Sequence, residues 1–124
     1  MLDLFVAAAA LLFLDQLSKR IVRRRRVRGM KCTCTGHRSR VGLVLIWFLA
    51  LACATILHAS SATFQSHLSM LGVGAALGGA AGNLSDVLRR RAIVDFIDLG
   101  WWPVFNVADI GIVAGLVAAF LPLV

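Results

Sequence analysis

Long apolar runs dominate this chain and limit what it can fold into. Four of them, at about 2–22, 41–59, 68–88 and 107–124, make the sequence 60% hydrophobic and give it a mean hydropathy of +0.86. A helix of about 20 residues, rising about 1.5 Å per residue, crosses the ~30 Å hydrocarbon layer of a bilayer. We therefore expect an all-α, polytopic membrane protein in which residues 1–124 form a single membrane-embedded domain of four transmembrane helices with short connections.

The basic residues are confined to one side of this expected arrangement. All 13 Lys and Arg residues lie within 19–40 or at 89–91, and the net charge is +7. No aromatic residues alternate with the arginines after the first apolar run, as a surface for stacked bases would require. The expected partner of this basic loop is therefore the anionic head groups of membrane lipids, and not nucleic acid. The positive-inside rule would make the basic side cytoplasmic.

The three cysteines do not form a recognisable metal motif. Cys32 and Cys34 are followed by His37, but a metal site needs more ligands than this segment supplies, and we expect no metal. Cys53 lies within the second apolar run, where a cysteine usually behaves as a small hydrophobic residue. We therefore expect Cys53 to be buried.

Three carboxylates, Asp95, Asp98 and Asp109, lie in the stretch 92–113 of a chain that has only six acidic residues. Charge is costly in apolar surroundings, so these residues are candidates for function. Two carboxylates held close together cannot easily both ionise, so one keeps a proton while the other acts as a base. The alternative is that they cap helices beside a membrane surface, and we expect Asp98 to be such a solvated residue.

The first and third apolar runs also carry polar residues. Asp15 and Lys19 are four residues apart and share a helical face. They form either an interfacial ion pair, with Lys19 reaching for the head groups, or an inward pair that supports a site between helices.

The third run contains Gly74, Gly78 and Gly82, a spacing that lets a neighbouring helix backbone approach closely. Asn83 and Asp86 follow them. These two side chains could hydrogen-bond a catalytic group or a substrate backbone, or they form a polar fringe at the helix end.

Several of these residues belong to stretches that resemble one family. They are 14–19 (LDQLSK), 78–86 (GGAAGNLSD), 94–96 (VDF) and 105–109 (FNVAD). In them the chain resembles bacterial lipoprotein signal peptidases, the signal peptidase II family. That family consists of four-helix aspartic endopeptidases of the bacterial inner membrane. They remove signal peptides from prolipoproteins just before a lipid-modified cysteine, without a cofactor.

The resemblance implies a role for each matching polar residue. Asp95 and Asp109 would be the catalytic pair. Asp15, Asn83 and Asn106 would order the site or bind substrate, while Asp86 and Lys19 would give structural support. Prolipoproteins and membrane lipids would be the partners of a multi-pass protein of the inner membrane.

The chain departs from the family in two places. The family usually has Arg directly after the residue that matches Asp86, where this chain has Val87; Arg89 or Arg90 could replace it, the latter one helical turn from Asp86. The family's first extracytoplasmic loop usually forms a small β-structured cradle for substrate, whereas here that loop is short and basic.

These departures keep alternatives open. One is a divergent, non-catalytic membrane paralogue that binds anionic lipid or a protein partner. Another is a small transporter, suggested by Asp15 but opposed by the scarcity of membrane carboxylates and of inverted repeats. The family orientation would also place the basic side outside, against the positive-inside rule.

Overall fold

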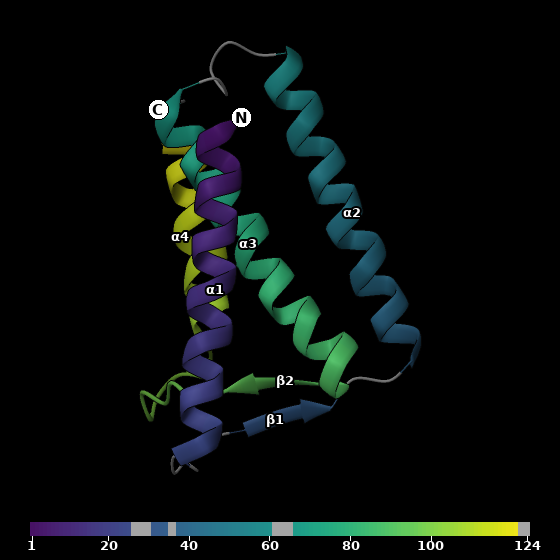
Figure 1. The fold of residues 1–124 in the computed structure, drawn as a ribbon, viewed down its shortest axis with the longest axis vertical. Coiled ribbons are helices and arrows are strands. Elements are labelled where there is room, and N and C mark those ends of the chain that lie inside the picture. The colour runs from purple at the N-terminus through teal and green to yellow at the C-terminus, as the bar shows by residue number, and fades with distance from the viewer. Residues whose placement is uncertain (26–30, 35–36, 61–65, 122–124) are drawn as a thin grey trace.

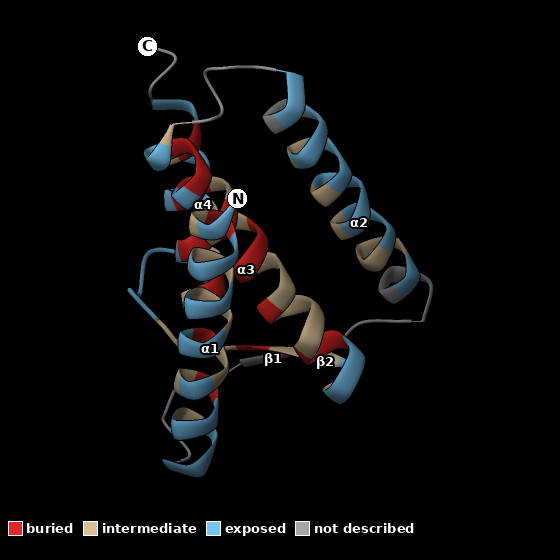
Figure 2. Ribbon diagram, turned by 45° about the horizontal axis from the view of Figure 1, so that its top comes forward, coloured by how far each residue is buried: buried red, intermediate tan, exposed pale blue. Residues whose placement is uncertain are grey.

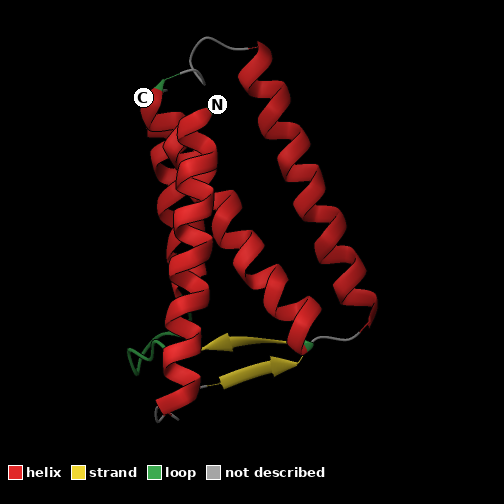
Figure 3. Cartoon of the chain, in the orientation of Figure 1, coloured by secondary structure: helices red, strands yellow, loops and turns green. Residues whose placement is uncertain are grey.

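Helices make up most of the molecule, in the number that the apolar runs predict. The computed structural model describes residues 1–25, 31–34, 37–60 and 66–121, without the side chains of 31–40, 57 and 58. Figure 3 shows the helices with a small sheet at one end. The four helices are α1 (Leu2–Arg25), α2 (His37–Ser60), α3 (His67–Arg90) and α4 (Val107–Phe120).

The small sheet was not predicted, so the expectation of an exclusively helical fold was incomplete. Strands β1 (Lys31–Cys34) and β2 (Ala92–Asp95) pair antiparallel, with Lys31 opposite Asp95. Each strand has only four residues, too few for an alternating pattern to be distinctive. Figure 1 shows the sheet at the end of the bundle where α1 and α3 end and α4 begins. The sheet therefore lies beside the polar residues singled out in the sequence.

Helix α3 ends in a way that directs the chain into this sheet. Its first turn is capped by Ser66, whose hydroxyl accepts a hydrogen bond from the Ser69 backbone N–H at 3.1 Å. Its last turn is followed by Arg91, which adopts the left-handed conformation with φ 58° and donates its backbone N–H to Val87 O. The next residue begins β2, so the end of α3 and the start of the strand are fixed together.

Glycines let α3 pack against α1 without intervening side chains. Gly74 and Gly78 lie against the α1 backbone at Leu4 and Ala8, where an added Cβ would overlap main-chain atoms. One turn further on, Gly82 lies against a side chain of α1. The prediction of a close helix approach along this glycine ridge is confirmed, and the neighbour is α1.

The opposite face of α3 packs against α4 in the same manner. Gly72 lies against the α4 backbone near Gly115 and Ala119, and Gly79 lies against Ala108. Because α3 has glycines on both faces, it forms the middle of a three-helix group with α1 on one side and α4 on the other.

Helix α2 stands apart from this group. Figure 2 shows α2 beside the other helices with no buried segment among its described residues. A hydrogen bond links it to α3: Trp47 Nε1 donates to Leu77 O at 3.1 Å. Cys53 is exposed, so the prediction that it is buried was wrong; on this part of α2 it is Leu51 and Ala54 that pack against the core.

The outer surfaces of all four helices carry large exposed apolar side chains. Within the described residues, no helix has the combination of length and apolar character that crossing a membrane requires. Among the exposed side chains are Phe5, Phe13, Leu45, Phe48, Leu49, Ile56, Leu71, Val113 and Val117.

Candidate active site

A buried lysine lies at the centre of the polar residues. Lys19 and Asp15 are both fully buried, and Lys19 Nζ lies 2.8 Å from Asp15 Oδ2. The ammonium also lies 2.8 Å from Asp86 Oδ2 and 3.0 Å from Asn83 Oδ1. Three acceptors therefore satisfy its three donors. Asp15 and Lys19 thus point inward, as one of the two alternatives predicts, and the interfacial alternative was wrong.

Asp15 also connects α1 to the start of α4. Its second oxygen, Oδ1, accepts the backbone N–H of Ala108 at 3.0 Å, in the first turn of α4. A carboxylate is favourable there because the first N–H groups of a helix lack intrahelical partners. One side chain thus binds the lysine and the beginning of α4 at once.

Asp86 is the second acidic partner of this network. It is fully buried and forms ion pairs with Lys19 and with Arg90 of the next turn. The prediction that Arg90 could pair with Asp86 is confirmed, while Val87 is buried in the apolar interior. Two cations therefore compensate a carboxylate that would otherwise be a costly buried charge.

Gln16 is a member of the network that the sequence analysis did not single out. Its Nε2 lies 3.2 Å from Asp15 Oδ2, 3.1 Å from Gly82 O and 3.3 Å from Asp86 Oδ1. The signal that could have found it is its polarity, directly after Asp15 in an otherwise apolar run.

The two asparagines have amide orientations that their partners determine. Asn83 Oδ1 accepts from Lys19 Nζ and from Asn106 Nδ2, both at 3.0 Å. Because an ammonium can only donate, the Asn83 Nδ2 group must point the other way, and it donates to Asp109 Oδ1 at 2.9 Å. Asn106 Nδ2 also donates to Asp95 Oδ1 at 2.7 Å. The lysine thus fixes which way both amides face.

Asp109 is held by the first turn of α4. Asn106 caps this helix, and its side chain accepts the Asp109 backbone N–H at 3.0 Å. In return, Asp109 Oδ2 accepts the Asn106 backbone N–H at 3.0 Å. This reciprocal capping box follows from the local sequence Asn-Val-Ala-Asp. Both Asp109 oxygens therefore accept N–H donors, one from Asn106 and one from Asn83.

Asp95 lies at the end of β2, and its Oδ1 accepts a hydrogen bond from the side-chain amide of Asn106. An isolated bridge between Ile97 and Phe105 closes the turn that follows, and it brings Asp95 and Asn106 side by side although they are eleven residues apart. Burial raises the pKa of Asp95 above its ordinary value of 3.8; the hydrogen bond from Asn106 opposes this rise, and the charge of Asp109 adds to it. Asp95 therefore keeps its proton to a higher pH than an ordinary aspartate does.

Asp98 differs from the other two carboxylates. It is exposed, and its Oδ1 accepts the backbone N–H of Gly100 at 2.8 Å in the surface turn. Gly100 has φ 81°, a left-handed conformation that favours glycine. The expectation that Asp98 is a solvated residue is confirmed.

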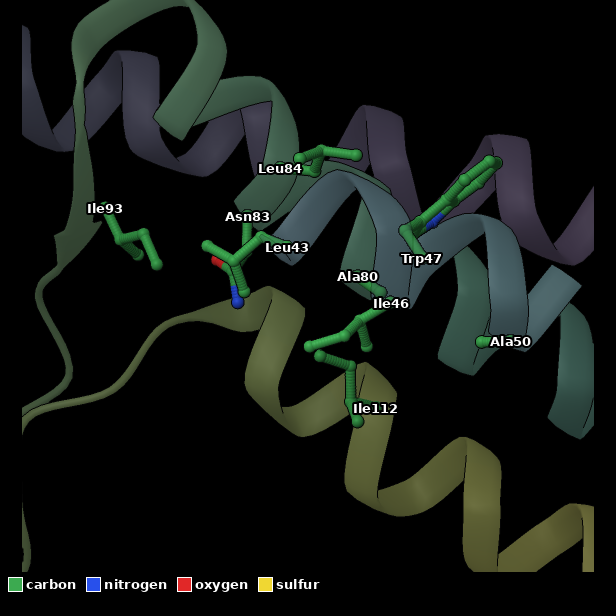
Figure 4. Close-up of a pocket in the computed structure, with 9 residues that line it drawn as sticks. All are labelled: Leu43, Ile46, Trp47, Ala50, Ala80, Asn83, Leu84, Ile93 and Ile112. Carbon is green, nitrogen blue, oxygen red and sulfur yellow. The ribbon is translucent and has the colours of Figure 1, made fainter. Parts of the chain in front are cut away.

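Apolar clefts border the network on two sides. One has a volume of about 210 Å³, and Figure 4 shows Asn83 at its end nearest the start of α4. The other has a volume of about 300 Å³ and lies between Asp109 and Trp102 on the outer side of α4. The first is lined by Leu43, Ile46, Trp47, Ala50, Ala80, Asn83, Leu84, Ile93 and Ile112. The sequence did not indicate these lining residues, because which face of α2 meets α3 depends on the tertiary arrangement.

The site was also searched for metal ligands. In the described part of the chain, no group of three or more His, Cys, Asp or Glu side chains could hold a metal ion. The side chains of Cys32, Cys34 and His37, considered above as a metal motif, lie outside the described residues.

Comparison with protein families identifies the class of this arrangement. Residues 26–124 match the family model described as signal peptidase (SPase) II. This match covers most of the chain, which therefore belongs to the signal peptidase II family. The resemblance inferred from the sequence motifs is confirmed.

Curated relatives agree with this assignment. The chain is 51% identical over 61 residues to a lipoprotein signal peptidase of Rhodococcus jostii, covering 44% of this chain and 31% of that protein. It is 56% identical over 50 residues to one of Syntrophomonas wolfei, covering 40% and 34%. It is 44% identical over 75 residues to one of Nitratidesulfovibrio vulgaris, covering 57% and 46%. In each case the match spans less than half of the relative.

Solved structures share the fold. Two bacterial membrane enzymes, determined by the in meso method at 2.3 and 1.9 Å resolution, superpose with TM-scores of 0.79 and 0.80. Their sequences are 18% and 19% identical to this chain. The superpositions cover 97% and 98% of this chain and 86% and 92% of those structures.

Proposed function

We propose that this chain is an aspartic endopeptidase of the bacterial inner membrane that removes signal peptides from prolipoproteins, just before the lipid-modified cysteine. The observation that carries the proposal is the convergence of Asp95 and Asp109 on one asparagine, Asn106, from two different elements. Membership of the signal peptidase II family supports the reaction class.

The two carboxylates take different roles in the proposed reaction. Both Asp109 oxygens already accept donors, whereas Asp95 Oδ2 has no hydrogen-bond donor among the described residues. Asp95 is therefore assigned the proton, and Asp109 is assigned as the base that deprotonates water. The water attacks the scissile carbonyl while Asp95 protonates the carbonyl oxygen. The tetrahedral diol then collapses: Asp109 gives its proton to the leaving nitrogen, and Asp95 recovers a proton from the diol.

The surrounding residues act as positioning groups in this proposal. Asn83 and Asn106 hold the carboxylates at a fixed separation, and Lys19 fixes the direction of both amides. Asp15 and Asp86 hold the lysine in place. No cofactor enters the reaction, because carboxylates and water supply every proton transfer.

The apolar clefts are proposed to receive substrate. A signal peptide and the acyl chains on the cysteine are both apolar. One cleft is bordered by Asp109 itself and the other by Asn83, which donates a hydrogen bond to Asp109, and both are lined mainly by apolar side chains. Burial of this apolar surface on binding would drive the substrate to the site.

A multi-pass location in the membrane is part of the proposal, with residues 1–124 as one embedded domain. It is supported by the large apolar side chains that all four helices direct outward, such as Leu45, Phe48 and Val113, which lipid would cover at no cost. The arginines at the sheet end would meet anionic lipid head groups.

The direct test is cleavage of a purified diacylated prolipoprotein by the purified full chain in detergent. We expect a signal peptide and a shortened lipoprotein that begins at the lipid-modified cysteine. Absence of cleavage under conditions where a lipoprotein signal peptidase from Rhodococcus jostii is active would overturn the proposal in favour of a non-catalytic, lipid-binding paralogue.

Orientation in the membrane is tested separately, because the carboxylates must face the outer side to meet this substrate. Single cysteines replace Ser60 or Leu99, which are exposed at opposite ends of the bundle, in a chain whose Cys32, Cys34 and Cys53 are serine. A membrane-impermeant thiol reagent on intact cells should label the Leu99→Cys chain only. Labelling of the Ser60→Cys chain alone would exclude cleavage of ordinary prolipoproteins.

A further inference from the structure

A polar cleft borders the Asp86 side of the network, away from Asp95 and Asp109, between the C-terminal parts of α1 and α3. Its volume is about 400 Å³. Guanidinium groups from both helices line it, together with apolar side chains of α1. The lining residues are Phe13, Gln16, Leu17, Arg20, Arg23, Arg89 and Arg90.

The charge of this cleft is largely uncompensated. Arg90 pairs with Asp86, which Lys19 already neutralises. For Arg20, Arg23 and Arg89, the described part of the chain shows no ion pair with an acidic side chain. The cleft therefore presents several guanidinium groups to an anion from outside.

The cleft changes character along the helix axis. Phe13 and Leu17 are exposed apolar side chains, and Arg20 and Arg23 follow them on the same helical face toward the C-terminus. Over about 15 Å, at about 1.5 Å per residue, the surface thus passes from apolar to cationic. A phospholipid has the same sequence of parts, an acyl chain followed by a phosphate head group.

We infer that this cleft binds one anionic phospholipid, with its phosphate diester on the arginines and its acyl chain along Phe13 and Leu17. Arginine suits this ligand because its planar group can donate two parallel hydrogen bonds to a phosphate. The inference rests on the proposed membrane location but not on peptidase chemistry, since Asp95 and Asp109 do not line the cleft.

A matched control separates this site from a general effect of charge. Arg24 and Arg25 lie in the last turn of α1, as the cleft residue Arg23 does, but they do not line the cleft. Arginines near a helix C-terminus stabilise it through the helix dipole, and Arg24 and Arg25 share that role. Substitution of Arg20 and Arg89 should therefore weaken lipid binding more than substitution of Arg24 and Arg25 only if the lipid binds specifically in the cleft.

The experiment is native mass spectrometry of the full chain titrated with phosphatidylglycerol, or with phosphatidylcholine of identical acyl chains. The unmodified chain should retain one phosphatidylglycerol preferentially. The Arg20→Gln/Arg89→Gln chain should bind it roughly tenfold more weakly, whereas Arg24→Gln/Arg25→Gln should change binding by less than about twofold. Equal weakening by both pairs, or no weakening by either, would overturn the inference.

A further arm distinguishes a lipid from a free phosphate. Millimolar glycerol 3-phosphate should not displace the bound lipid, and Phe13→Ser should weaken phosphatidylglycerol binding. Displacement by glycerol 3-phosphate together with no effect of Phe13→Ser would indicate a simple phosphate site and overturn the lipid assignment. Cleavage activity is not the readout, so failure of the peptidase proposal would leave this result interpretable.

Discussion

The three-helix group α1, α3 and α4 and the separate helix α2 meet their neighbours in opposite ways. Within the group, glycines such as Gly78 bring backbones into contact, and partly buried hydrogen bonds cross from Lys19 through Asn83 to Asp109. Helix α2 has no buried residue among those described and leaves apolar clefts beside Trp47. The close packing of the group holds the carboxylates in place, while the looser packing of α2 leaves space for a bound substrate. We therefore expect substitutions in the group to abolish activity or folding, and substitutions in α2 to alter substrate binding.

The largest effect is expected at the carboxylates themselves. Asp95→Asn and Asp109→Asn should each lower the cleavage rate by about 10³-fold or more, because each removes one proton transfer. Asp98→Asn, the matched control in the same stretch, should change the rate by less than about twofold. Signal peptide release from a diacylated substrate measures all three. Near-normal turnover by either of the first two chains would contradict the proposed mechanism.

Loss of the buried lysine should come next. Lys19→Met leaves Asp15 and Asp86 buried without their shared cation, and we expect the free energy of unfolding to fall by about 3–5 kcal/mol. Thermal unfolding in detergent gives the measurement, with Arg24→Met on the exposed face of α1 as the control.

A second variant separates folding from positioning. Adding Asp15→Asn to Lys19→Met should recover part of the stability but not the activity, because the amide of Asn83 is then free to turn. Recovery of full activity with stability would show that Lys19 only supports the fold.

The glycine contacts offer a direct comparison between the two regions. Gly78→Leu forces a side chain into the α1 backbone at Ala8 and should cost about 3 kcal/mol. Gly42→Leu in α2 places its Cβ where no atom lies within 4 Å, so stability should stay constant or rise slightly with helix propensity. Melting midpoints in one detergent measure both. Equal losses at the two positions would contradict the distinction between the packed group and α2.

A smaller effect is expected where α2 touches the group. Trp47→Phe removes the hydrogen bond to Leu77 O and should destabilise the chain by about 0.5–1.5 kcal/mol. Because Trp47 also lines the cleft beside Asn83, KM should rise while kcat stays close to normal. A fall in kcat with unchanged KM would place α2 among the elements that fix the carboxylates.

The smallest effect concerns Asp95 and pH. Its raised pKa means that the folded chain holds this proton more tightly than the unfolded chain, so the stability it contributes is lost as pH rises through the folded pKa. The Asn side chain of Asp95→Asn has no proton to lose. The melting temperature of this variant should therefore rise relative to that of the unmodified chain as pH increases from 4 to neutrality, because the neighbouring charges of Asp109, Asp86 and Lys19 are the same in both chains. A fall in the melting temperature of the variant relative to the unmodified chain over that range would mean that the fold stabilises the ionised form of Asp95.

The parts that the sequence predicted have a local or periodic cause. The spacing of Gly74, Gly78 and Gly82 predicted a close helix contact. The Asn106–Asp109 capping box was not predicted, although its cause is equally local. The pairing of β1 with β2, by contrast, joins segments about 60 residues apart and depends on where α1 and α3 end. The exposure of Cys53 depends on which residues of α2 pack against the core, which no local pattern encodes.

The hydrogen bond from the Ala108 backbone to Asp15 has a consequence for biosynthesis. It joins α1 to a segment of the chain that is made 93 residues later. Asp15 Oδ1 lacks this donor until the start of α4 has been made, which is also when Asp109 and its capping partner Asn106 become available. A nascent chain therefore lacks the second carboxylate until α1, α2 and α3 have been made, so the proposed protease would be inactive toward neighbouring nascent polypeptides up to that point.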